Sequence, residues 1–373
     1  MDVRASGGSA RNGPQGKAAR GGKLHYGSHA CGNGGCLRPA PFPARERSRT
    51  RIMASPRVSA IIATHNRAEL VGQAIKSALS QTVRPAEIIV VDDGSSDSTP
   101  QVLSEYGSDI RILRQPNRGR SAARNAGVKH AQGDIIAFLD SDDIWLPEKL
   151  EKQLAAFKAS PGAGLVHTFS DVVDAKGAQL PRETGRRQQL YRRALKRGYT
   201  YEGMSQECIM FLSTVAVRRE CWERSGPMDT AIPAFEDWDW YLRAAVYTEI
   251  ATIPETLVHF RKHAGNTSSR EFLEGRVKTC RKHLALLDGR PRSSHRERAR
   301  RNFCVQLAAA YYVHGSSAQA GKWMREAVRT DPSVLLRPSH LRYSLAMCLP
   351  ESLLNGIRRL GRQFSHEATN EST

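Results

Sequence analysis

The chain has 373 residues, of which 40% are hydrophobic, and its formal net charge at pH 7 is +19. This allows one large domain or two ordinary ones, and no apolar run approaches the roughly 20 residues of a membrane-spanning helix. The seven cysteines are scattered without a CxxC pair, which excludes a recognisable zinc site or disulfide framework and favours a reducing compartment. The positive charge fits nucleic acid, an anionic membrane or phosphorylated ligands as partners, and it also fits solvated Lys and Arg side chains.

Residues 1–55 are rich in Gly, Arg, Ser and Pro and show no strand or helix period. We therefore predict a disordered basic leader there. Met53 stands directly before the first strand signal, and we hypothesise that translation begins at this residue. Intact mass spectrometry that finds residues before Met53 on the native protein would refute this hypothesis.

After the leader, short apolar runs alternate with segments of helical spacing. The predicted strands are 58–63, 87–91, 110–113 and 135–139, and the predicted helices are 68–80, 99–106, 121–131 and 148–158. This alternation is typical of a parallel sheet covered by helices on both faces. Further strands are predicted at 165–173, 208–217 and 257–261, with a helix at 238–246. The basic stretch 175–203 has no assignable pattern, and from 271 onward only helices are predicted, at 273–287, 296–314, 318–329 and 341–364.

Three polar clusters follow predicted strands where each strand ends. They are Thr-His-Asn-Arg at 64–67, Asp-Asp-Gly-Ser-Ser-Asp at 92–97 and Asp-Ser-Asp-Asp at 140–143. Any one of them alone is an ordinary turn or helix cap. Ligands of open α/β sheets bind at the carboxyl ends of the strands, so three such clusters on one rim predict a binding site.

Asp140 and Asp142 form the pivotal pair of the third cluster. Two carboxylates one residue apart can supply hard oxygen ligands to Mg²⁺ or Mn²⁺, and their mutual repulsion favours a cation between them. A divalent ion there would neutralise charge on a leaving nucleoside diphosphate. A DxD triplet alone is common, so its weight comes from the strand before it and the Trp-Leu-Pro-Glu sequence that follows at 145–148.

The stretch 58–150 resembles the nucleotide-binding half of family 2 glycosyltransferases. The matching segments are VSAIIATHNR at 58–67, IVVDDGSSDST at 89–99, NRG at 117–119, ARNAG at 123–127 and FLDSDD at 138–143. The resemblance continues less densely to about Asn266. It implies an α/β fold of the GT-A type, with a mostly parallel Rossmann-like sheet flanked by helices and a C-terminal helical extension. The implied divisions are a nucleotide-sugar-binding half at 56–160, an acceptor-binding half at 161–270 and a helical region at 271–373.

The same resemblance implies roles for donor-side residues. Asp93 matches the carboxylate that binds the base of the nucleotide, and His65 stands where many relatives have Tyr or Phe, which puts the identity of the base in doubt. Asp142 matches the metal ligand, with Asp140 assisting and Asp143 as a lesser candidate. The full donor-binding set predicted is His65, Asn66, Arg67, Asp92, Asp93, Arg124, Asn125, Asp140, Arg261 and His263. For Arg124, Arg261 and His263, an ordinary solvated or rim position is the alternative.

Glu236 and Asp237 resemble the acidic pair of the acceptor half. The match makes Asp237 the general base that takes the proton of the acceptor hydroxyl, in a single displacement that inverts configuration. The alternative is that both acids simply cap a helix. Asp239 lies in the same turn but is offset from the pair.

The predicted function is therefore an inverting, metal-dependent transfer of a sugar to an acceptor hydroxyl in cell-surface polysaccharide or glycolipid synthesis. The expected partners are a UDP-sugar and a saccharide or lipid-linked saccharide, in the cytoplasm at the inner face of a membrane. Segment 341–364 could rest on anionic lipid, or pack on the catalytic domain or a second subunit. One alternative, a nucleotidyltransferase, normally has a Gly-rich loop after the first strand, and 64–67 has no glycine. Nucleic-acid binding is the other, but no zinc finger, RNP pattern or basic-region heptad occurs.

Overall fold

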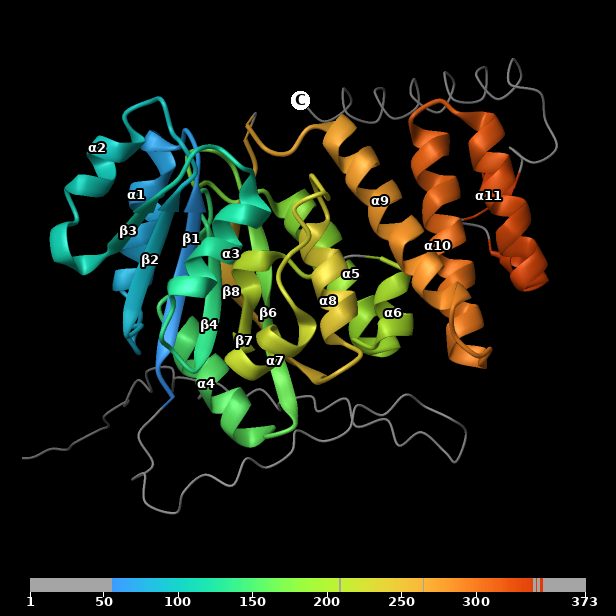
Figure 1. The fold of residues 1–373 in the computed structure, drawn as a ribbon, viewed down its shortest axis with the longest axis horizontal. Helices are drawn as coiled ribbons and strands as arrows, with labels where there is room; N and C mark the ends of the chain where they lie inside the picture. The colour runs from blue at the N-terminus through green and yellow to red at the C-terminus, as the bar shows by residue number, and fades with distance from the viewer. Residues whose placement is uncertain (1–55, 208, 264, 338–339, 341–342, 345–373) are drawn as a thin grey trace, which may run out of the picture.

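A computed structural model of the chain describes residues 56–207, 209–263, 265–337, 340 and 343–344. The leader, Met53 and nearly all of the predicted helix 341–364 lie outside these residues. Figure 1 shows a central sheet with helices on both of its faces and a group of helices beyond it, on the right of the view. The predicted α/β fold with a helical C-terminal extension is confirmed.

The first half is a parallel βαβ arrangement, as the sequence pattern predicts. β1 (Val58–Thr64) pairs in parallel with β2 (Glu87–Asp92) and β4 (Ile135–Asp140), and β2 pairs with β3 (Arg111–Arg114). The connecting helices are α1 (Ala68–Leu79), α2 (Thr99–Ser104) and α3 (Arg120–His130). β1 is almost entirely buried because helices cover both faces, which explains its continuous apolar run.

The second half turns the sheet into a mixed one of eight strands, in the order β3-β2-β1-β4-β7-β6-β8-β5. β7 (Val215–Arg218) runs antiparallel to both β4 and β6 (Ala163–Val173), and β5 (Ile144–Trp145) runs antiparallel to β8 (Glu249–Arg261). The predicted strand 208–217 is confirmed only at 215–217: residues 209–211 lie in no strand, and Leu212–Thr214 form a 3-10 turn. β8 begins at Glu249, earlier than the predicted 257. The prediction began late because Pro254 and Glu255 interrupt the apolar pattern of the strand.

Several helices of this half had no clear sequence signal. α5 (Pro181–Arg197) and α6 (Tyr201–Ser205) lie in the basic stretch left unassigned, and α7 (Arg219–Ser225) follows β7 directly. α5 buries only Tyr191 and Ala194 fully, so its sparse apolar face gave no pattern. α4 (Lys149–Ala159) and α8 (Glu236–Ala244) lie close to their predicted positions.

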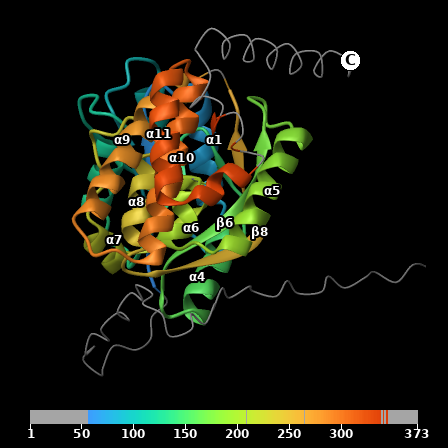
Figure 2. The ribbon, with the colours of Figure 1, turned by 90° about the vertical axis from the view of Figure 1, so that its right-hand side faces the viewer.

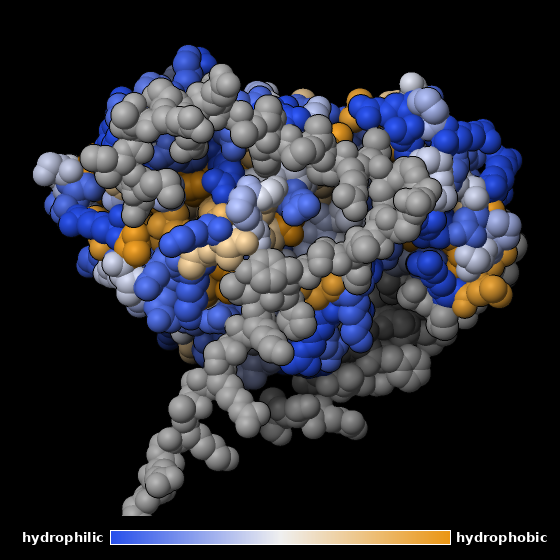
Figure 3. All heavy atoms as spheres, turned by 90° about the horizontal axis from the view of Figure 1, so that it is seen from below, coloured by the Kyte–Doolittle hydropathy of each residue, from blue (hydrophilic) through white to orange (hydrophobic). Residues whose placement is uncertain are grey.

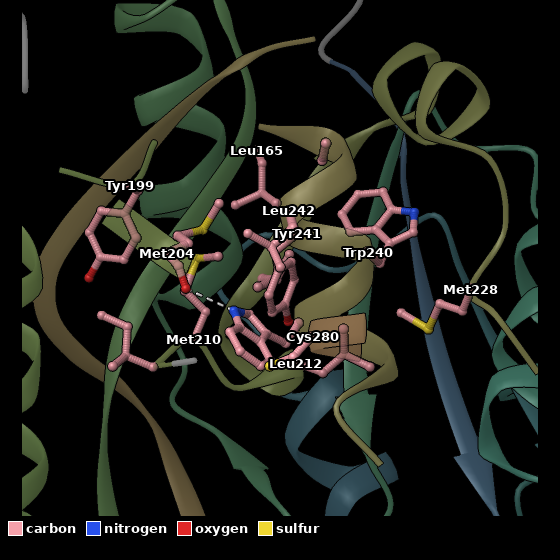
Figure 4. Close-up of a cluster of buried hydrophobic side chains, with 14 of the residues drawn as sticks. Leu165, Tyr199, Met204, Met210, Leu212, Met228, Trp240, Tyr241, Leu242 and Cys280 are labelled. Carbon is pink, nitrogen blue, oxygen red and sulfur yellow. Dashed lines mark hydrogen bonds between the residues drawn. The ribbon is translucent and has the colours of Figure 1, made fainter. Parts of the chain in front are cut away.

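The C-terminal region packs against the sheet domain through one continuous core. Its helices are α9 (Ser269–Asp288), α10 (Ser294–Val313) and α11 (Ser317–Thr330). One buried cluster runs from the sheet through α8 to Phe303 and Met324 of these helices. Figure 4 shows Trp240, Tyr241 and Leu242 of α8 among Met204, Met210 and Met228 in this cluster. α8 is therefore held on both sides, by the sheet and by α9 and α10.

The surface of the described residues is mostly polar. In the view of Figure 3, the visible described atoms are mostly hydrophilic, with smaller apolar areas between them. No helix within the described residues has the length and apolarity needed to cross a bilayer. The described cysteines Cys221, Cys280 and Cys304 are free and buried.

Candidate active site

Strand register brings the three polar clusters to one edge of the sheet. Thr64 at the end of β1 pairs with Asp92 of β2, and the neighbouring Ala63 pairs with Asp140 of β4. In Figure 1 this edge is the upper one, where α3, α8 and α9 also begin. The carboxyl ends of parallel strands lie at the same edge of a sheet. The register of β1, β2 and β4 therefore brings the three loops together, as predicted.

The first cluster is organised by its own polar side chains. His65 Nδ1 donates to the carbonyl of Asp93 at 2.9 Å, so Nε2 is the acceptor nitrogen and faces the amides of Asn66 and Asn117. Asn66 adopts a left-handed backbone, with φ of 50°, and its side-chain oxygen accepts from the amide N–H of Ser96 at 2.8 Å. The non-glycine residue in this conformation is a strained position, which is common at functional sites.

Asp93 holds the loop that precedes α3. Its Oδ1 accepts from the Gln115 side chain at 2.7 Å and the Arg118 amide at 3.0 Å, and Oδ2 accepts from the Gly119 amide at 2.8 Å. A carboxylate offers about four acceptor positions, so one remains for a ligand. Asp92 is also buried and accepts from the amide of Ser95. Neither Gln115 nor this loop geometry was predicted from the sequence.

The three aspartates of the third cluster have different surroundings. The Asp140 and Asp142 side chains are 31% and 18% exposed, whereas Asp143 is buried and accepts from Ser213 Oγ at 2.6 Å and the Arg261 amide at 3.0 Å. Burial, with Asp142 and Asp140 nearby, raises the pKa of Asp143 well above its usual value. Asp143 therefore anchors the turn, and Asp140 and Asp142 are the carboxylates left to bind a ligand.

Asp142 lies between two basic side chains from distant segments. His263 Nε2 donates to its Oδ2 at 2.9 Å, since His263 Nδ1 accepts from the Gly265 amide. Arg67 Nε lies 3.9 Å from the same oxygen, and the Arg67 guanidinium also donates to the Gly265 carbonyl at 2.7 Å. The segment after β8 is thus tied to the loop after β1, across Asp142.

Arg124 connects the loop after β4 with the start of α8. It projects from α3, is buried, and donates to Asp140 Oδ1 at 2.6 Å and to Glu236 Oε1 at 2.5 Å. Burial alone would lower its pKa, but the charges of Asp140 and Glu236 raise that pKa above its usual value. Arg124 is therefore not a solvated helix residue, which was the alternative to a role in the site.

Glu236 and Asp237 are the first two residues of α8, and they lie beside Arg124. The residue before them, Phe235, has a left-handed backbone with φ of 62°, which turns the chain sharply into the helix. Asp237 is half-buried, and Oδ1 accepts from the Trp238 amide at 2.7 Å. Burial first, and then Glu236 and Asp140, raise the pKa of Asp237 to about 7, although Arg124 opposes this.

Two residues of the predicted donor set have their side chains occupied by the protein itself. All three nitrogen atoms of the buried Arg261 guanidinium donate to protein acceptors: the Asp142 carbonyl, the Ala175 carbonyl and Gln73 Oε1. Asn125 makes two hydrogen bonds to the backbone of Met228, both of 2.9 Å. These geometries fit residues that hold the walls of the site.

The DxD pair fits a divalent cation that shares its ligands with a diphosphate. Among the described residues, no group of three His, Cys, Asp or Glu side chains is arranged to hold a metal alone. Mg²⁺ is usually bound by one or two carboxylates together with substrate phosphates and water. Asp140 and Asp142 are partly exposed hard-oxygen donors; Asp140 accepts a hydrogen bond from Arg124, and Asp142 accepts one from His263.

Comparison with known proteins identifies the family. The model described as glycosyl transferase family 2 matches residues 59–217. An "uncharacterized glycosyltransferase" of Nostoc sp. is 32% identical over 224 residues, which is 56% of this chain and 66% of that protein. "Uncharacterized glycosyltransferase YwdF" of Bacillus subtilis is 29% identical over 218 residues, or 58% of this chain and 78% of its own. The segment 59–217 of this chain belongs to glycosyl transferase family 2.

Solved structures show that the family 2 chain shares its fold with glycosyltransferases. S. aureus TarS 1–349 in complex with UDP-GlcNAc gives a TM-score of 0.59 at 18% identity, covering 82% of this chain and 92% of that one. The mannosyltransferase PcManGT from Pyrobaculum calidifontis, in complex with GDP-Man and Mn²⁺, gives 0.50 at 20% identity, covering 86% and 82%. The family match ends at residue 217, so the pair Glu236–Asp237 and the residues Arg261 and His263 lie outside it.

One functional residue had no sequence signal. Ser213 Oγ accepts from the Asp140 amide at 3.0 Å and donates to Asp143, so it fixes the backbone between the two candidate metal ligands. It lies in the 3-10 turn that the sequence pattern missed. A serine in an apolar stretch gives no hint of this contact, because its partners are about seventy residues away.

Proposed function

We propose that the protein transfers a sugar from a nucleotide-sugar to an acceptor hydroxyl by a single displacement that inverts the anomeric configuration. The observation that carries the proposal is the bridge from Arg124 to Asp140 and Glu236. It joins Asp140, which we assign to the donor phosphates, to Glu236 of the acidic pair that we assign to the acceptor.

Asp142, assisted by Asp140, would hold Mg²⁺ or Mn²⁺ together with the donor diphosphate. When bound, the ion would neutralise charge that develops on the departing nucleoside diphosphate. Arg67 and His263 flank Asp142 and would orient its carboxylate toward the phosphates. The complex of PcManGT with GDP-Man and Mn²⁺ supports the choice of metal.

Asp237 would act as the general base. Its pKa of about 7 lets it accept a proton near neutral pH, which is the condition for efficient base catalysis. Glu236 is fixed by Arg124, so it would position the start of α8 and shape the field around Asp237.

His65 and Asp93, with Asn66 and Asp92, would form the pocket for the nucleotide base. TarS structures with UDP and UDP-GlcNAc support a UDP-sugar as donor. The acceptor would be a saccharide or lipid-linked saccharide for cell-surface polysaccharide or glycolipid. We place this activity in the cytoplasm, at the inner face of a membrane.

Calorimetry with UDP-GlcNAc, UDP-glucose, UDP-galactose and GDP-mannose, each with and without Mn²⁺, tests the proposal. We expect one donor to bind in a metal-dependent manner and to release its nucleoside diphosphate slowly when water replaces the acceptor. Failure of every donor to bind would reject the proposal. Release of pyrophosphate from a nucleoside triphosphate and a sugar phosphate would favour the nucleotidyltransferase alternative.

A further inference from the structure

α5 carries a straight basic stripe on its outer side. Arg182, Arg186, Gln189, Arg193 and Lys196 are spaced by four, three, four and three residues, and all five are exposed. That spacing places them on one face of the helix. At 1.5 Å per residue the stripe is roughly 21 Å long.

The opposite face fixes this orientation. Tyr191 is fully buried, stacks on Phe169 with ring centroids 4.3 Å apart, and hydrogen-bonds Ser170 at 2.8 Å. The Arg187 guanidinium lies over the ring of Phe211 at 3.7 Å. α5 therefore cannot rotate its basic side inward, and Figure 2 shows the helix at the outer edge of the molecule beside β6 and β8.

Ion pairs do not neutralise the stripe within the part of the chain that the structure describes, although Glu183 lies near enough to Arg186 to interact with its charge. None of its four cations makes a hydrogen bond, or an ion pair within 4.0 Å, with another described residue. By contrast, cations of α9 and α10 pair with nearby acids, as Lys278 does with Glu274 and Arg300 with Asp288. Glu183, the acid of α5, is paired with Lys262 at 3.2 Å.

We propose that the stripe Arg182–Arg186–Arg193–Lys196 docks the protein on the anionic phospholipid surface of a membrane. Exposed cations near an anionic leaflet are attracted to it and lose little hydration. A straight row suits a planar surface, and the stripe contains no aromatic side chain on which a nucleic-acid base could stack.

The position of α5 relates this surface to the site. The ion pair of Glu183 with Lys262 joins the first turn of α5 to the residue next to His263, which contacts Asp142. A membrane beneath α5 would thus lie near the catalytic edge, within reach of a lipid-linked acceptor. This last point rests on the proposed function, whereas membrane binding itself does not.

The test is sedimentation of the full chain with extruded vesicles of phosphatidylcholine alone, or of phosphatidylcholine and phosphatidylglycerol at about 70:30. The stripe variant combines Arg182→Glu, Arg193→Glu and Lys196→Glu. The control combines Lys76→Glu, Lys129→Glu and Lys158→Glu, three exposed lysines on α1, α3 and α4, and changes the net charge equally.

We expect wild-type protein to bind the anionic vesicles and not the neutral ones, and the stripe variant to lose binding on the order of tenfold or more. The control should lose clearly less. Equal losses in the two variants, or wild-type binding to a 30-base-pair DNA but not to anionic vesicles, would overturn the proposal. Calorimetry with the donor and Mn²⁺ separates the two hypotheses: donor binding kept in the stripe variant leaves the proposed function standing whatever the vesicles show.

Discussion

Asp140 ends β4 and Glu236 begins α8, yet both accept hydrogen bonds from the guanidinium of Arg124. Arg124 and Glu236 are buried and Asp140 is partly exposed, and the two hydrogen bonds fix the positions of all three groups relative to one another. Any change of charge on one side of this bridge is therefore felt on the other. The predictions below use this coupling and the contacts around it.

Replacement of Asp142 by Asn should abolish sugar transfer and weaken nucleotide binding in the presence of Mn²⁺. The change removes the charge of one of the two carboxylates proposed to bind the metal ion, and such an ion has few protein ligands. Calorimetry with UDP-sugar measures the effect, and the same titration with EDTA is the control. Unaltered turnover, or an equal loss of affinity with and without metal, would show that Asp142 does not hold the ion.

Asp237→Asn should leave donor affinity unchanged and lower the transfer rate by about 10²–10⁴, because only the base is lost. The matched control is Asp239→Asn in the same turn. The Asp239 carboxylate is buried and bound by Arg243, Lys282 and His283, so its replacement should destabilise the fold. If donor affinity falls in Asp237→Asn, the role assigned to Asp237 is wrong.

The pH dependence of transfer follows from the pKa of Asp237, which is about 7. The base works only when deprotonated, so the rate should be constant above this pKa and fall about tenfold per pH unit well below it. A pH–rate profile measured at saturating donor tests the assignment. A profile that stays flat down to pH 5 would contradict it.

Gly275 of α9 should be necessary for the position of the acidic pair. A Cβ atom there would lie 1.9 Å from the Ala234 carbonyl oxygen, directly before Phe235 and Glu236. Gly275→Ala should lower the transfer rate with little change in donor affinity, and reduce stability by about 1–3 kcal/mol through overpacking. Gly289→Ala at the end of the same helix meets no atom within 4 Å and is the control. Equal transfer rates in the two variants would mean that α9 does not position the pair.

The local pattern of the sequence was enough to predict the βαβ half and its three polar clusters, because buried parallel strands require continuous apolar runs. It could not show which way the clustered side chains point. Asp143 was predicted as a lesser metal ligand and Arg261 as a donor-binding residue, but both are buried and their polar atoms are held by protein hydrogen bonds. α5 was not predicted because its exposed face is basic and its apolar face is short. The left-handed backbone at 235 was not predicted because the residue there is Phe and not the glycine usual in this conformation.

Arg124→Gln should test the bridge itself. The substitution leaves Asp140 and Glu236 near each other without their shared cation, and breaking a buried pair of this kind costs about 3–5 kcal/mol of folding stability. Because Arg124 lowers the pKa of Asp237, its loss should raise that pKa and move the acidic limb of the pH–rate profile to higher pH. Arg120→Gln, one turn earlier on α3, removes a part-exposed hydrogen bond to Thr267 and an exposed ion pair with Glu271 at 3.9 Å, and it should leave the limb in place. A profile that does not move in Arg124→Gln, in protein shown by thermal denaturation to be folded, would mean that Arg124 supports the structure without tuning the base.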